Sequence, residues 1–215
     1  DLFGWFMEEA KKRNMTVSLS DYTLGVGQGS YVDDALNENP GLTGAELKFE
    51  SDTIQNKYAK TCHDQLLSLY AYQLGTDGKI IENSGINLSG NLTGNKIEWQ
   101  SPTEGNWIVT QVYSVAKKPS LDPMHPLSGK SYVKHFFQRF EDRFPEQSKG
   151  GLNFFFSDEL NFNLHGYIWN SIFRDEFRKR KGYDIVPYLT ALFTHIGPIT
   201  PKIRLDYNDV MVSLS

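Results

Sequence analysis

Two adjacent carboxylates, Asp158 and Glu159, follow an apolar run from Gly151 to Ser157 that is typical of a buried β-strand. Side chains alternate between the two faces of a strand, so Asp158 shares a face with Phe154 and Phe156. Glu159 lies on the other face, where polar and apolar residues are mixed. In a parallel barrel the outward face is bulky and apolar, and polar groups point into the catalytic mouth. The pattern therefore predicts a proton-transferring Glu159 in such a mouth. The alternative is a strand that ends at two solvated acids capping the next segment.

A second strand has the same pattern. Residues 2–13 have the apolar stripe of an amphipathic helix, and Asn14 suits a left-handed position at its C-terminal end. Residues 15–20 then alternate apolar and small polar side chains and stop at Asp21-Tyr22. Two strands that each adjoin a helix and end at an acid predict a parallel α/β architecture. The loop Gly25 to Ser30 fits the rim of an active site better than a phosphate-binding loop, because its glycine spacing matches neither common phosphate motif.

From about residue 44 to residue 118 the pattern of apolar and polar residues is typical of β-hairpins. Short alternating runs are separated by turn signals such as Asn83-Ser84-Gly85 and Glu104-Gly105-Asn106. We expect an antiparallel insertion here. Trp99 and Trp107 flank the turn that contains Pro102, which predicts a cross-strand aromatic pair.

Helical spacing returns after residue 119. Asp122 and His125 lie in a Pro-pinned segment, where they either contact a ligand or form a turn and a local hydrogen bond. A helix with regularly spaced Phe residues follows, and another helix after Trp169 ends at Gly182. Asp206 to Asp209 are expected to open a last helix, since acids are favoured in a first turn.

Composition limits the function classes. The net charge of −4 argues against a nucleic-acid surface, which needs clustered Lys and Arg. No window is apolar and long enough to span a bilayer, and the N-terminus shows no signal peptide. Cys62 is the one cysteine, so an intramolecular disulfide is impossible and a buried, inert thiol is expected.

The inventory of strands is too small for a closed barrel. Eight strand-helix units are required, and the sequence predicts two or three. We therefore expect a fragment of a larger protein with barrel segments at residues 1–43 and 119–215, a β-rich insertion at 44–118, and the rest of the same polypeptide completing the barrel.

Several stretches together resemble the bacterial alpha-L-rhamnosidase-like glycoside hydrolases of family 106. They are the strand ending at Asp21-Tyr22 with its Gly-rich loop, Phe155 to Glu159, Phe173 to Asp184, Leu189 to Phe193, and Arg204 to Tyr207. The resemblance implies a partial TIM barrel in a secreted or periplasmic enzyme that acts on polysaccharides by an inverting mechanism, with calcium as a possible cofactor. By position Glu159 matches the general acid. This chain has Ser157 where the family usually has Thr, and Leu160-Asn161 where a Pro usually follows.

The leading hypothesis is thus a glycoside hydrolase in which Glu159 protonates the leaving oxygen, with Asp21, Tyr22, Asp158 and Trp169 binding substrate or supporting the site. The second carboxylate is expected elsewhere in the polypeptide, because Asp158 and Asp21 fall on the outward parity of their strands. Two other hypotheses stay open. One is a non-catalytic carbohydrate-binding protein, and the other is a polysaccharide lyase with Tyr22, His125 or His165 as its base.

Overall fold

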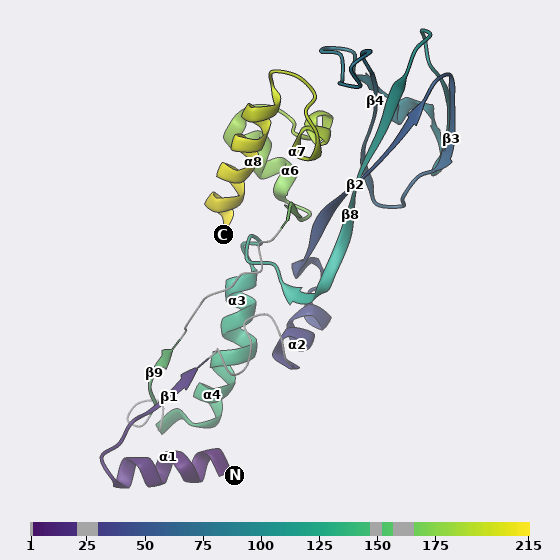
Figure 1. Ribbon diagram of the computed structural model, residues 1–215. Helices are drawn as coiled ribbons and strands as arrows, with labels where there is room; N and C mark the ends of the chain where they lie inside the picture. Colours follow the sequence, from purple (N-terminus) through teal and green to yellow (C-terminus); the bar gives the residue numbers. More distant parts are fainter. Residues whose placement is uncertain (1, 21–29, 147–151, 157–165) are drawn as a thin grey trace. The chain divides into compact units, whose positions relative to one another are not determined.

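The computed structural model describes residues 2–20, 30–146, 152–156 and 166–215, and these form a mixed α/β fold. Its contacts divide the chain into two units (Figure 1). The first comprises residues 1–44 and 117–164, and the second comprises residues 45–116 and 165–215. No closed barrel is found among the described residues.

The first unit contains the parallel pair that the two similar strands predicted. β1 (Val17–Ser20) pairs in parallel with β9 (Leu152–Phe156). The register places Leu19 beside Phe155, with an irregularity between Val17 and Ser18. Helix α1 (Leu2–Lys12) precedes β1, and Asn14 has φ 57°, the left-handed conformation expected of it.

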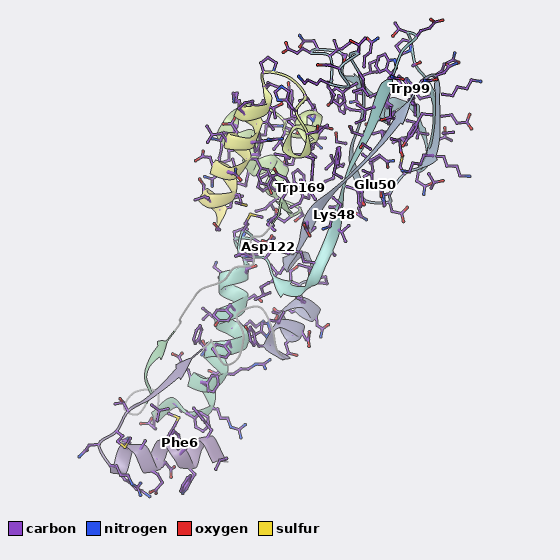
Figure 2. The ribbon with its side chains drawn as sticks, viewed as in Figure 1. Phe6, Lys48, Glu50, Trp99, Asp122 and Trp169 are labelled. Carbon is purple, nitrogen blue, oxygen red and sulfur yellow. The ribbon has the colours of Figure 1, made fainter. Side chains whose placement is uncertain are left out.

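The apolar stripe of α1 is only partly buried. Met7 and Ala10 are buried, and the Phe3 ring contacts Phe140 and Phe144. Phe6, labelled in Figure 2, keeps half of its surface exposed. The predicted helix is therefore confirmed, but its buried face is narrower than the apolar stripe indicated.

The remaining helices of this unit pack through aromatic rings. α2 (Ser30–Glu38) and the 3-10 turn η2 (Pro40–Leu42) precede β2, and the later run comprises α3 (Ser128–Tyr132), the π-helical stretch η4 (Val133–Phe137) and α4 (Gln138–Arg143). Tyr31 and Val32 of α2 are buried with Phe136 in one cluster. Across the same interface Glu38 forms an exposed ion pair with Lys134 and also lies within hydrogen-bond distance of His135 Nε2. Burial of the rings supplies most of the stabilisation, because exposed ion pairs contribute little.

The second unit is built on two antiparallel sheets, as the hairpin pattern predicted. Within the described residues the five-stranded sheet has the order β10-β2-β8-β4-β5 and the three-stranded sheet has the order β3-β7-β6. Their bounds are β2 Thr43–Ile54, β3 Lys57–Thr61, β4 Leu66–Gln73, β5 Ile86–Asn87, β6 Leu92–Thr93, β7 Lys96–Gln100, β8 Trp107–Leu121 and β10 Ile168–Trp169, with the 3-10 turn η3 at Ser89–Asn91. The long strands β2 and β8 cross the boundary between the units.

Each face of the five-stranded sheet has its own partner. On one face Trp107 and Val109 of β8 join Tyr58 and Ile97 of the three-stranded sheet in a buried cluster, which also holds Cys62. On the other face Thr110 of β8 contacts the helical part of the unit. Strand alternation explains this division, because odd and even residues of β8 point to opposite faces.

The helical layer of this unit comprises α6 (Phe173–Lys181), η5 (Val186–Tyr188), α7 (Thr190–Phe193) and α8 (Thr200–Leu214). Gly182 ends α6 with φ 77°, as predicted. Phe193 stacks on Phe49 of β2 at 5.1 Å, and the Thr190 hydroxyl lies 3.0 Å from the Thr110 hydroxyl. These contacts fix the helices on the sheet.

The prediction that Asp206 opens the last helix is wrong. α8 begins at Thr200, with Pro201 in its first turn, where a missing N–H costs nothing. Asp206 is therefore inside the helix, and it accepts a hydrogen bond of 2.7 Å from the Tyr183 hydroxyl and pairs with Lys202. The acid holds α8 to the segment after α6 instead of capping a helix.

Candidate functional site

The strands of the parallel pair β1–β9 are the described elements that come directly before the predicted catalytic residues in the sequence. The last paired residues are Ser20 and Phe156. In the sequence Asp21 and Tyr22 follow the first of these strands, and Asp158 and Glu159 come shortly after the second. All four predicted site residues lie outside the described residues, as does His165.

Trp169 is the predicted substrate-binding residue that the structure describes. It lies on β10 beside Ala45 of β2, and its ring packs on Phe173 with centroids 5.2 Å apart. Only 7% of its surface is exposed. A ring this buried acts on its surroundings through packing, and its role toward a sugar stays a prediction.

Asp122 and His125 form a local turn, which was one of the two possibilities for them. The buried Asp122 accepts a hydrogen bond of 3.0 Å from the Met124 N–H, and its own N–H donates to the Leu42 carbonyl. His125 Nδ1 accepts from the Leu127 N–H at 3.3 Å. These bonds make a Pro-pinned turn after β8.

A group of interacting polar side chains joins the two sheets of the second unit. We call it the Glu50 cluster; its members are Glu50 and Asp52 of β2, Tyr58 and Lys60 of β3, His63, and Gln111 and Tyr113 of β8. Sequence reasoning missed it. The alternation of Glu50 and Asp52 along one strand was a visible signal, but their partners depend on how β2, β3 and β8 are brought together.

The two carboxylates of the cluster are held by defined donors. Lys60 Nζ lies 3.1 Å from Glu50 Oε2 and 3.0 Å from Asp52 Oδ2, so one ammonium bridges both acids. His63 Nε2 lies 3.0 Å from Glu50 Oε1, and its ring stacks on Tyr113 with centroids 3.5 Å apart. These contacts from Lys60 and His63 fix the two carboxylates in place. Figure 2 shows Glu50 in the middle of β2.

A second line of bonds runs from the cluster into the core. The Tyr58 hydroxyl donates to Asp52 at 2.9 Å and accepts from Gln111 Nε2 at 3.1 Å. Tyr58 and Gln111 are both buried, and Gln111 Oε1 has no hydrogen-bond partner among the described residues. The phenol thus connects a half-exposed acid with a buried amide.

The pKa shifts of the cluster favour a structural role. The hydrogen bonds from His63 and Lys60 lower the pKa of Glu50, so this acid stays ionised near neutral pH. Lys60 has a raised pKa, first because of its bond to Asp52, and burial followed by the bond to Asp52 raises the pKa of Tyr58. A carboxylate kept ionised cannot donate a proton at neutral pH. Glu50 can therefore hold charges in place but does not act as a proton donor at neutral pH.

No group of three or more His, Cys, Asp or Glu side chains able to hold a metal ion is found within residues 2–20, 30–146, 152–156 and 166–215. A role for calcium, which the resemblance suggested, stays a prediction. None of its helices is long and apolar enough to cross a membrane.

Comparison of this chain with protein-family models, with curated proteins and with solved structures finds no match. The resemblance to rhamnosidase-like glycoside hydrolases therefore stays a hypothesis that rests on the quoted stretches of sequence.

Proposed function

We propose that this chain is part of a glycoside hydrolase with alpha-L-rhamnosidase-like specificity, in which Glu159 is the general acid. β1 and β9 are then neighbouring strands of a partial TIM barrel that the rest of the polypeptide completes. The observation that supports the proposal is the parallel pairing of these two strands. In parallel α/β enzymes the residues that follow the carboxyl ends of the strands form the active site.

The chemistry needs two carboxyl groups. Glu159 protonates the glycosidic oxygen as the bond between this oxygen and the anomeric carbon breaks. A second carboxylate takes a proton from the water that attacks the anomeric carbon from the opposite side. In an inverting enzyme the two groups are separated by about 6.5–9.5 Å, which leaves room for the water.

The pairing of β1 with β9 gives a reason to test Asp21 as that second carboxylate. The two strands are parallel, and Ser20 and Phe156 are their last paired residues. In the sequence Asp21 follows Ser20 directly, and Glu159 follows Phe156 by three positions. Both acids therefore come shortly after the carboxyl ends of neighbouring parallel strands, where the residues of an active site are expected. A carboxylate from the rest of the polypeptide is the competing candidate.

The other predicted assignments belong to the same proposal. Tyr22 and Asp158 contact substrate or support the acids, and Trp169 is proposed as a further substrate-binding residue. We also propose a secreted or periplasmic location and a requirement for calcium. Both rest on the resemblance alone.

The experiment compares wild type with Glu159→Gln in the full-length protein. Substrates are an aryl alpha-L-rhamnoside and a rhamnose-containing oligosaccharide. Loss of a general acid lowers turnover by about 10²–10⁴-fold. The loss is smaller for the aryl glycoside, because a good leaving group needs less protonation. Glu98→Gln, an exposed acid on β7, is the matched control and keeps wild-type turnover.

Each rival function has its own result. Turnover that persists within a few-fold in Glu159→Gln contradicts the assignment of the acid. Binding of the oligosaccharide by the wild-type protein without turnover favours a non-catalytic carbohydrate-binding protein. Unsaturated products that absorb in the ultraviolet indicate a lyase.

A further inference from the structure

A polar groove in the second unit lies where two connections cross between its sheets. Gln55-Asn56 joins β2 of the five-stranded sheet to β3 of the three-stranded sheet, and residues 101–106 return from β7 to β8. The two connections line a groove of about 530 Å³ together with Gln100. Small-molecule sites have volumes of about 300–1,000 Å³.

The groove is held in shape by hydrogen bonds to two backbone carbonyls. The Ser101 N–H donates to the Asn56 carbonyl at 2.8 Å, which ties one wall to the other. The indole of the buried Trp107 donates to the Thr103 carbonyl at 3.2 Å and anchors the longer connection to the core. The shape of the groove thus depends little on the side chains that line it.

The side chains that line the groove are mostly amides and hydroxyls. The amides of Gln55, Asn56, Gln100 and Asn106 make no hydrogen bond to another side chain or to the backbone within the described part of the chain. Glu104 is the charged residue of the lining, which includes no Lys or Arg. An amide offers both donors and an acceptor, so four of them present mixed hydrogen-bonding groups to a ligand.

These properties select a class of ligand. An anion such as a phosphate needs cationic partners, and the lining offers a carboxylate instead. A hydrophobic ligand needs apolar walls, and Pro102 is the one apolar side chain among the lining residues. A neutral ligand whose hydroxyls both donate and accept hydrogen bonds matches the four amides. We propose that this groove binds a neutral oligosaccharide.

The proposal does not depend on Glu159 being a catalytic acid. An accessory sugar site on the β-rich part would hold a polysaccharide chain on the protein whether or not the protein cleaves it. A single exposed polar site of this kind binds its sugar weakly, because water competes for every hydrogen bond.

The test measures binding of three neutral probes, maltohexaose, xylohexaose and a rhamnose-containing hexasaccharide, to the full-length protein by titration calorimetry. The Glu159→Gln background prevents turnover. Asn56→Ala combined with Gln100→Ala removes two of the four amides and keeps the backbone bond from Ser101 to residue 56. We expect at least about a tenfold loss of affinity for the bound probe, from the loss of two or more hydrogen bonds.

Gln65→Ala combined with Asn91→Ala is the matched control, because both are exposed amides in other turns of the same unit. This control keeps wild-type affinity. Unchanged affinity in the groove variant, or binding of none of the three probes by the parent protein, overturns the proposal. Preference for an acidic oligogalacturonide over all three neutral probes overturns the assigned ligand class. Failure of the hydrolase proposal shows as retained turnover in Glu159→Gln, which is a separate result from lost binding.

Discussion

Trp99 and Trp107 meet edge to face with ring centroids 5.5 Å apart, although their strands, β7 and β8, belong to different sheets. The sequence predicted the contact from the turn between them, but as a cross-strand pair within one sheet. The pair instead closes the space between the two sheets next to the groove. Trp107 is 3% exposed, and Trp99 is half-buried.

We expect Trp107→Ala to lower the free energy of unfolding by about 3–5 kcal/mol, because it removes a buried ring and leaves a cavity. It also removes the indole donor that holds the Thr103 carbonyl. Trp99→Ala is the matched variant and costs less, since part of this ring already contacts solvent. Urea unfolding followed by circular dichroism measures both. Equal losses would contradict the unequal burial of the two rings.

Tyr58→Phe tests the inner part of the Glu50 cluster. The variant removes the hydroxyl that accepts from Gln111 and donates to Asp52. Since Gln111 is buried and its other amide atom has no described partner, we expect a loss of about 1–3 kcal/mol in stability.

Tyr113→Phe is the control for Tyr58→Phe. Its hydroxyl donates to Glu50 at 3.3 Å, and this ring is only half-buried. The expected loss is below about 1 kcal/mol. A larger loss of stability in Tyr113→Phe than in Tyr58→Phe would show that burial of the hydroxyl does not decide how much each hydrogen bond contributes.

Asp184 gives a pH-dependent prediction. It accepts hydrogen bonds from Arg174 at 3.0 and 2.5 Å, from Arg178 at 3.0 Å and from the Val186 N–H at 3.1 Å. The Arg174 bond is the main cause of its lowered pKa. Because the folded pKa is below the unfolded value of about 3.9, the stabilisation is complete well above that pH. It is lost as the pH falls through the folded pKa.

We therefore expect Asp184→Asn to destabilise the protein at pH 7, by about 1–2 kcal/mol given its partial exposure. The difference from wild type should shrink as the pH is lowered from 5 to about 2. Urea unfolding at several pH values checks this. A difference that grows with acidity would show that the carboxylate is not the stabilised form.

Asp21→Asn distinguishes the two candidates for the second carboxylate. If Asp21 activates the water, turnover falls by about 10²-fold or more for both the aryl glycoside and the oligosaccharide, because the base acts on the nucleophile and not on the leaving group. This differs from Glu159→Gln, in which the loss of turnover is smaller for the aryl substrate than for the oligosaccharide. Steady-state kinetics of the full-length protein with both substrates measures it. Wild-type turnover in Asp21→Asn assigns the base to another residue.

Local signals predicted local structure well. The left-handed positions of Asn14 and Gly182 and the antiparallel strands between residues 44 and 118 follow from turn residues and alternation, which act over a few positions. α8 begins at Thr200 and not at Asp206, because Pro201 suits the first turn of a helix. Acids are favoured in a first turn but also occur further along a helix, so Asp206 is the weaker signal for its start.

Arrangements that depend on distant segments were not accessible in the same way. The Tyr113 hydroxyl donates to Glu50 across 63 positions of the sequence, because β8 and β2 are neighbours in one sheet. Likewise, the pairing of Leu19 with Phe155 joins residues more than a hundred positions apart. Parity within one strand is readable from sequence, whereas the register between strands is set by the whole fold.

The π-helical stretch η4 has a consequence for how this chain tolerates changes in length. A π-helix holds one residue more per turn than the α-helix around it. That extra residue lets Phe136 be buried against α2 while the adjacent Phe137 contacts Tyr132. A one-residue deletion at His135 is therefore expected to convert η4 into ordinary α-helix without breaking the run, and to leave α3 and α4 in nearly the same rotational phase, because the residue removed is the extra one of the wider turn. In this helix a one-residue deletion would be absorbed by a change of helix type.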